Sequence, residues 1–184
     1  MRIIRRAGLT EAAWRNGGGV TREIMVAQEG DALLWRLSMA DLVAEGPFSD
    51  FSGFARVLTV IEGGPIWLEA PDRRLIAARG VPVRFDGGLT VRSVLPAGPA
   101  SVINLISDPH RVSEEVTPLR GPQTVRLAPR DGTRLAVICL TGTVAVGQAA
   151  LLKGDTALVD AEPVDMSLGA GGSVLRIALA SVSS

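Results

Sequence analysis

Short apolar runs, separated by turn residues about every ten positions, recur along the whole chain and constrain its fold more than any other feature. The runs are rich in valine, isoleucine and leucine, and the 21 glycines and 11 prolines are spread between them rather than gathered in a linker. None shows the apolar stripe, repeating about every 3.6 residues, of an amphipathic helix. The pattern predicts an all-β sandwich or barrel, with strands near residues 22–27, 33–40, 56–61, 66–69, 81–85, 89–94, 101–106, 135–140, 156–159 and 174–180. One helical turn is expected at residues 10–14, with Thr10 as its N-cap.

An internal repeat divides this β pattern into two copies. Residues 57–63, Val-Leu-Thr-Val-Ile-Glu-Gly, resemble residues 136–142, Ala-Val-Ile-Cys-Leu-Thr-Gly, and each copy continues with a short strand and a glycine-led apolar segment. This order is typical of a cupin barrel, so two copies predict a bicupin. We expect an N-terminal half at residues 1–118, which carries the ligand pocket, and a C-terminal half at residues 119–184. Because the second half is short, we expect it to share strands with the first.

Charge and cysteine content exclude several classes of function. The 19 basic residues balance the 19 acidic ones, which argues against a nucleic-acid or membrane-surface partner. The uncharged stretch at residues 135–152 contains a Thr141-Gly142 turn and is expected to form two strands rather than a membrane helix. The lone Cys139 cannot form an internal disulfide and is expected to be a buried thiol. With no secretory signal at the N-terminus, we expect a cytoplasmic protein.

Histidine content bears on metal chemistry, because cupins usually hold their metal with several imidazoles. The chain has one histidine, His110, and no dense acidic cluster. We therefore expect no bound metal and no cofactor. The preferred interpretation of His110 is a surface residue after an Asp-Pro turn, and the alternative is a general base oriented by Asp108.

The densest motif is Trp-Arg-Asn-Gly-Gly-Gly-Val-Thr-Arg-Glu-Ile at residues 14–24. Three glycines let a ligand or a strand approach closely, and a flexible hairpin loop is the alternative. A phosphate loop is excluded, because no Lys-Ser/Thr pair follows and the next element is a strand. In the run at residues 35–40, Arg36, Ser38 and Ala40 should share one face. Residues 46–56 hold three of the four phenylalanines, which either plug a barrel end or form an apolar wall beside a pocket.

Three strings together resemble the HutD/Ves family: residues 14–24, Trp-Arg-Leu-Ser-Met-Ala at 35–40, and Gly-Pro-Phe-Ser-x-Phe-x-Gly at 46–53. The resemblance implies a metal-free bicupin associated with bacterial histidine utilisation. It also implies binding of a histidine-breakdown intermediate such as formyl- or formimino-glutamate, in a regulatory role. The chain departs from the family at Ser52, where proline is frequent, and in the string at residues 102–108. That string keeps Asn104 but lacks the family's acidic residue and arginine, so the ligand is expected to differ if those two groups contact it in relatives.

Two functional hypotheses follow, and the first is a small-molecule binding protein for a small carboxylate. Arg36 and Arg56 would bind the acid group, since arginine pairs with carboxylates through two hydrogen bonds. The remaining candidates are neutral hydrogen-bonding groups at Asn16, Thr21 and Ser49, an acceptor for an N–H group at Glu23, and an apolar wall of Trp14 and Phe51. The alternative for the charged residues is that Arg36 and Glu23 pair with each other inside the barrel.

The second hypothesis, ranked lower, is a metal-independent isomerase or hydrolase that uses Glu23 as its base. Since cupin-type proteins often dimerise, a homodimer is a further expectation, by analogy alone.

Overall fold

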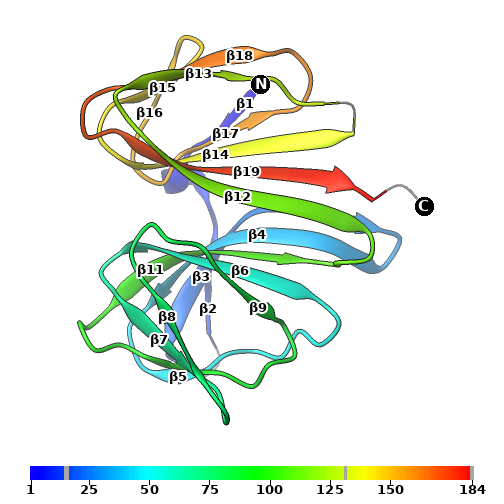
Figure 1. The fold of residues 1–184 in the computed structure, drawn as a ribbon, viewed down its shortest axis with the longest axis vertical. Helices are drawn as coiled ribbons and strands as arrows, with labels where there is room; N and C mark the ends of the chain where they lie inside the picture. The colour runs from blue at the N-terminus through cyan, green and yellow to red at the C-terminus, as the bar shows by residue number, and fades with distance from the viewer. Residues whose placement is uncertain (15–16, 131, 183–184) are drawn as a thin grey trace. The chain divides into compact units, whose positions relative to one another are not determined.

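The computed structural model describes residues 1–14, 17–130 and 132–182, and the described part of the chain is built from β-strands and one short 3-10 turn. These strands form two compact units (Figure 1). We call Thr10–His110 the N-terminal barrel, and Met1–Leu9 together with Arg111–Ser184 the C-terminal barrel. Within the described ranges, the chain has no helix of the length and hydrophobicity that crossing a membrane requires. The all-β prediction is confirmed.

The N-terminal barrel consists of two sheets. The larger sheet contains, in spatial order, β2 (Glu11–Ala13), β3 (Gly19–Glu29), β4 (Ala32–Leu42), β11 (Ala100–Ser107), β6 (Ala55–Glu62) and β9 (Val83–Asp86). The smaller sheet contains β5 (Gly46–Pro47), β10 (Arg92–Val94), β7 (Ile66–Glu69) and β8 (Arg74–Ala77). A core of buried residues from both sheets joins them, including Leu42, Leu58, Ile66, Leu68 and Val102.

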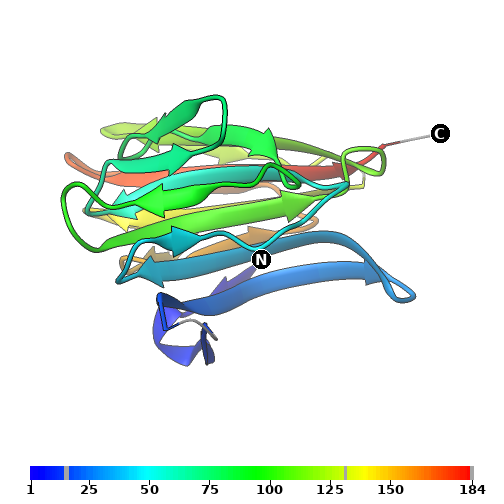
Figure 2. The ribbon, with the colours of Figure 1, turned by 90° about the horizontal axis from the view of Figure 1, so that it is seen from below.

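Alternation along the central strands of the larger sheet sets which side chains face this core. Successive strand residues point to opposite faces, so every second residue of β4, β11 and β6 lies on the inner side. Register places Ser38 of β4, Asn104 of β11 and Leu58 of β6 side by side across the three strands. The long antiparallel strands β3 and β4, blue in Figure 2, continue this sheet toward its edge. Polar side chains on these inner positions therefore share one interior space.

The C-terminal barrel repeats the arrangement with other strands. Its larger sheet contains, in order, β1 (Arg2–Ile4), β17 (Thr156–Val159), β14 (Thr133–Thr141), β19 (Ser173–Ser181) and β12 (Val112–Arg120). Its smaller sheet contains β13 (Gln123–Leu127), β18 (Val164–Leu168), β15 (Val144–Val146) and β16 (Ala149–Leu151). Buried residues such as Val137, Cys139 and Met166 form its core, and burial raises the pKa of the Cys139 thiol to about 11, with a further contribution from Asp155.

The repeated segments occupy corresponding strands, β6 and β14. Each strand ends at a glycine with positive φ, Gly63 at 67° and Gly142 at 70°. A Cβ atom at Gly63 would lie 2.3 Å from the Pro99 carbonyl oxygen, and one at Gly142 would lie 2.6 Å from the Gly171 carbonyl oxygen. Both positions therefore need glycine for its conformation and for the close approach of a second segment.

The N-terminal residues join the C-terminal barrel through β1 and one buried carboxylate. After β1, which pairs with β17, comes the 3-10 turn η1 (Arg6–Gly8). Asp155 accepts hydrogen bonds from Arg5 Nη1 at 2.6 Å and from the backbone N–H groups of Arg6 and Leu152, both at 3.0 Å. Burial by itself would raise the pKa of Asp155, but these donors outweigh it and hold the pKa below its usual value.

The structure differs from the sequence-based boundaries at two places. Residues 10–14 were expected to form a helical turn, and that prediction is wrong: β2 pairs with β3, and Arg22 Nε donates to Glu11 Oε1 at 3.1 Å. The half-boundary predicted after residue 118 falls inside β12, whereas the two compact units divide after His110. Pro118 fits within β12 because that strand is at the edge of its sheet, where one side needs no ladder hydrogen bond.

Candidate functional site

A cavity of about 530 Å³ lies inside the N-terminal barrel. Six of the eight residues predicted from the sequence line it: Trp14, Thr21, Arg36, Ser49, Phe51 and Arg56. The other lining residues are Ser38, Ala40, Leu42, Pro47, Phe48, Leu58, Val102, Asn104 and Ile106. Glu23 is not among the lining residues but forms an ion pair with one of them, and Asn16 lies outside the residues that the structure describes.

Arg56 is the most deeply buried charged group of the cavity, with 5% of its surface exposed. Its Nη2 donates to Asn104 Oδ1 at 3.2 Å and its Nη1 donates to the Ser49 carbonyl oxygen at 3.3 Å, while its buried Nε has no hydrogen-bond partner. Both acceptors are neutral, and none of the described residues forms an ion pair with Arg56. Burial therefore lowers the pKa of Arg56 to about 10.

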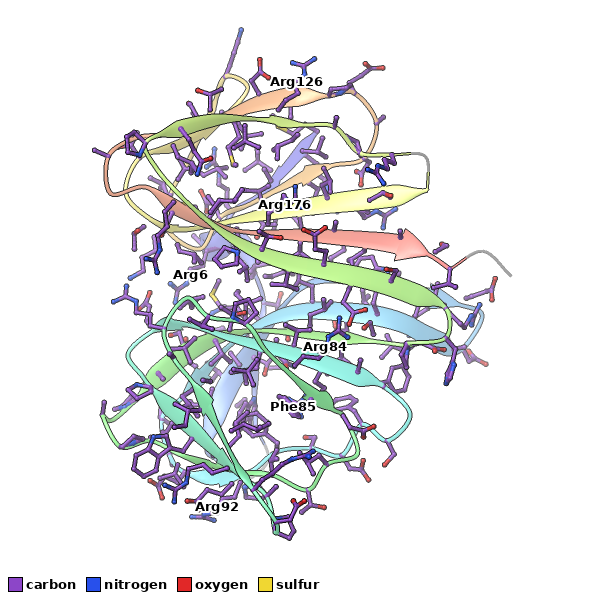
Figure 3. The ribbon with its side chains drawn as sticks, viewed as in Figure 1. Arg6, Arg84, Phe85, Arg92, Arg126 and Arg176 are labelled. Carbon is purple, nitrogen blue, oxygen red and sulfur yellow. The ribbon has the colours of Figure 1, made fainter. Side chains whose placement is uncertain are left out.

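Aromatic rings surround the Arg56 guanidinium. Its central carbon lies 4.9 Å from the ring centre of Phe48, 5.5 Å from that of Phe51 and 5.2 Å from that of Phe85. Phe85, labelled in Figure 3, points into the interior of this barrel. The ring faces attract the cation, but they do not replace a counter-ion. Of the two interpretations offered for the phenylalanine-rich loop, the apolar wall therefore describes Phe48 and Phe51, which line the cavity.

Arg36, the second guanidinium of the cavity, already has a carboxylate beside it. Its Nε lies 3.1 Å from Glu23 Oε2, at the distance of an ion pair but without the angle of a hydrogen bond. The pair is partly solvated, since 33% of the Arg36 side chain and 47% of the Glu23 side chain are exposed. This is the pairing that the sequence left open as the alternative for these two residues. A register shift in β3 between Glu23 and Met25 accompanies it.

The triple-glycine motif shapes the hairpin between β2 and β3. The backbone N–H of Trp14 donates to the Gly19 carbonyl at 2.9 Å, and Trp14 Nε1 donates to Thr21 Oγ1 at 2.7 Å. A Cβ atom at Gly19 would lie 2.3 Å from the Asp41 carbonyl oxygen, so this glycine lets the hairpin approach β4 closely. The motif is thus a tight hairpin that places the Trp14 ring in the cavity wall.

Three lining residues that matter for the chemistry were not among the predicted site residues: Ser38, Phe48 and Asn104. Ser38 Oγ donates to the Asn104 carbonyl oxygen at 3.4 Å, and Asn104 orients the Arg56 guanidinium. Asn104 was detectable as a single amide within the apolar run Val-Ile-Asn-Leu-Ile at residues 102–106. Ser38 was detectable because it shares a strand face with Arg36.

This set of side chains can bind an anion but does not fit a metal ion. Two guanidinium groups face the cavity, and they repel a cation at short range. The neutral donors are hydroxyl and amide groups rather than imidazole or thiolate. Within the described part of the chain, no three His, Cys, Asp or Glu residues gather as a metal site. His110 is exposed in a turn, where its backbone N–H donates to Asp108 Oδ1 at 2.9 Å.

The C-terminal barrel contains a smaller cavity of about 360 Å³ with a different charge arrangement. Arg176 and Arg126, labelled in Figure 3, both line it. Arg176 Nη2 donates to Glu115 Oε1 at 2.7 Å, and Arg126 Nη1 donates to Asp165 Oδ1 at 3.0 Å. Arg130 also lines this cavity, and the other two lining arginines, Arg126 and Arg176, have carboxylate partners.

Comparison with known proteins places the chain in a family. The family model described as HutD matches residues 6–176, which is nearly the whole chain. The chain belongs to the HutD family. This family agrees with the resemblance found in the sequence motifs.

Two Pseudomonas proteins are similar to this HutD family chain. The structure of HutD from Pseudomonas fluorescens SBW25, in a formate condition, superimposes with a TM-score of 0.85 at 30% identity and covers 99% of both chains. A Pseudomonas putida protein named for its place in the hutC 3′ region is 35% identical over 116 residues. That alignment covers 60% of each chain, so it spans less than two thirds of the relative.

A more distant structure supports the fold alone. The bacterial pirin YhhW from Escherichia coli, solved in complex with nickel(II), matches with a TM-score of 0.73 at 9% identity and covers 98% of this chain and 99% of its own. The cupin fold predicted from the internal repeat is therefore confirmed.

Proposed function

We infer that this HutD family protein is a metal-free binding protein for a small carboxylate, which it takes into the cavity of the N-terminal barrel as part of histidine utilisation. A regulatory role, in which the protein senses or sequesters a pathway intermediate, follows from binding without turnover. Formyl-glutamate and formimino-glutamate are the ligands to test first.

The observation that carries the proposal is the buried, unpaired guanidinium of Arg56. A buried charge is costly unless it is paired, and the described residues supply only two neutral acceptors and three aromatic rings. A ligand carboxylate beside the Arg56 guanidinium would provide the missing counter-ion.

The rest of the cavity suits the remainder of such a ligand. Thr21, Ser38 and Asn104 offer neutral hydrogen-bonding groups near the acid group, while Trp14, Phe48 and Phe51 offer apolar surface. A cavity of about 530 Å³ lies within the range of small-molecule sites and has room for a ligand of the size of an N-acylated amino acid.

The enzymatic alternative requires a desolvated carboxylate base. Glu23 instead has 47% of its side chain exposed and lies 3.1 Å from the Arg36 guanidinium, so it is neither desolvated nor free to act as a base. The geometry therefore favours binding over catalysis.

Thermal unfolding with added ligand tests the proposal. Histidine, urocanate, formimino-glutamate and formyl-glutamate form the panel, with the corresponding amides as controls that lack the carboxylate charge. A ligand at 100 times its Kd should stabilise the protein by about 2.7 kcal/mol. Arg56→Met should abolish this gain, whereas Arg92→Met should retain it, because Arg92 is an exposed arginine of the same barrel (Figure 3). No stabilisation by any carboxylate, or equal stabilisation of the Arg56 variant, would refute the proposed function.

A further inference from the structure

We propose that Glu23 sets the charge selectivity of the cavity for its ligand. By offsetting the charge of Arg36, Glu23 leaves Arg56 as the one lining cation, among the described residues, that has no carboxylate partner. The cavity therefore selects ligands with one net negative charge over dianions. This inference rests on the proposed function, because it concerns which carboxylates the same cavity accepts.

The charge count of the cavity supports this role. Among the lining residues, the groups with formal charge are Arg36 and Arg56. Glu23 lies 3.1 Å from Arg36 and offsets its charge, whereas Arg56 has only neutral acceptors. A ligand with one negative charge balances the site, while a second carboxylate would enter a space whose second cation already has a partner.

The position of the pair makes Glu23 a competitor for that second carboxylate. Arg36 lines the cavity, and Glu23, opposite the lining residue Ser38, lies half exposed beside the Arg36 guanidinium. A dianion must either displace Glu23 or lie near its negative charge, and both choices reduce affinity. A ligand with one negative charge can bind beside Arg56 without displacing Glu23 and without approaching its negative charge. Within the panel above, this favours formimino-glutamate, whose amidinium offsets one carboxylate, over formyl-glutamate, in which both charges are negative.

A matched pair of ligands isolates the effect of the second charge. Glutarate and glutaramate have the same carbon skeleton, and an amide replaces one carboxylate in glutaramate. We expect the wild-type chain to bind glutaramate more tightly than glutarate in isothermal titration. Glu23→Gln should strengthen glutarate binding about five- to tenfold and change glutaramate binding by less than about twofold, as expected for a partly exposed charge pair.

Two further variants control the test. Glu69→Gln removes the same charge from the same barrel, at an exposed carboxylate that pairs with Arg74, and should change neither affinity. Arg36→Gln leaves Glu23 without its partner and should weaken glutarate binding more than glutaramate binding. Since the Glu23 side chain is half exposed, its variant should unfold at the wild-type temperature.

The result can be separated from failure of the proposed function. If Arg56→Met does not affect glutaramate binding, the binding site itself is wrong. If glutaramate binding depends on Arg56 but Glu23→Gln changes both affinities equally, or neither, the binding site stands and the role of Glu23 is refuted. An equal gain in Glu69→Gln would assign the effect to overall charge and would also refute it.

Discussion

Replacing Arg56 by methionine should leave the ligand-free protein about as stable as the wild type while abolishing carboxylate binding. Methionine is shorter than arginine, unbranched and uncharged, and its flexible thioether can fill part of the space between Phe48, Phe51 and Phe85. A buried arginine with a structural partner would behave differently, since breaking a buried pair costs about 3–5 kcal/mol. The variant therefore distinguishes a ligand-binding arginine from a structural one.

The expected magnitude follows from the surroundings of Arg56. Burial lowers its pKa from 12.5 to about 10, and at about 1.4 kcal/mol for each pKa unit the cation costs the folded state about 3 kcal/mol. The substitution also removes two long hydrogen bonds and three ring contacts, worth about 0.5–1 kcal/mol each. The two sides nearly cancel, so we expect the free energy of unfolding to change by no more than about 1 kcal/mol.

Urea denaturation, with the midpoint and the slope determined separately, measures this change. An unchanged slope shows that the variant still unfolds from the same compact state, so the midpoint then reports stability. A loss of about 3 kcal/mol or more would show that Arg56 holds the barrel together, and the inference of an anion site would lose its main support.

Three other predictions concern groups outside this test. The low pKa of Asp155 means that its contribution to stability is present above about pH 4 and is lost as the pH falls through the folded-state pKa. Asp155→Asn should therefore cost about 2–4 kcal/mol at pH 7 and reduce the loss of stability on the acid side of a pH–stability profile. An unchanged acid side would contradict this. Gly63→Ala should destabilise the protein by more than about 1 kcal/mol because its Cβ atom would meet the Pro99 carbonyl oxygen. Gly98→Ala is the control in thermal unfolding: Gly98 also has positive φ but lies in open space, so its loss should be smaller, and equal losses would refute the steric reason. Trp14→Phe and Thr21→Val should each cost about 1 kcal/mol, and the double variant should cost little more than either, whereas additive losses would show that their hydrogen bond contributes nothing.

The fold was predictable from the sequence wherever strands are buried. Runs such as Ile66–Glu69 and Thr156–Val159 were predicted with the same first and last residues that the structure shows, because a run of apolar residues indicates a buried strand. Strands with polar, exposed faces, such as Arg74–Ala77 and Gln123–Leu127, carry no such signal and were missed. The segment at residues 10–14 was misassigned because its hairpin pairing with β3 outweighs its local helix-capping signal.

The site was only partly predictable, for a related reason. Alternation along β4 correctly placed Arg36 and Ser38 on one face, since that strand is regular there. Alternation also placed Thr21 and Glu23 on one face, but only Thr21 lines the cavity. The register pairs Thr21 with Ala40 and Glu23 with Ser38, so both lie opposite cavity-lining residues as alternation predicts. What the sequence does not reveal is that Glu23 is half exposed and lies beside Arg36.

The internal repeat supplies an argument for function that either barrel alone would not. When Gly63 is aligned with Gly142, Arg56 aligns with Leu135, which is buried and lines the cavity of the C-terminal barrel. The same strand position is thus filled by leucine in one copy of the fold, so the scaffold does not require a charge there. Burying an arginine without a counter-ion at this position gives the fold no clear net gain in stability, since the contacts of Arg56 only about offset the cost of its burial. Proteins commonly depart from the optimal local packing where a ligand supplies the missing partner, so this position supports the proposed anion site at Arg56.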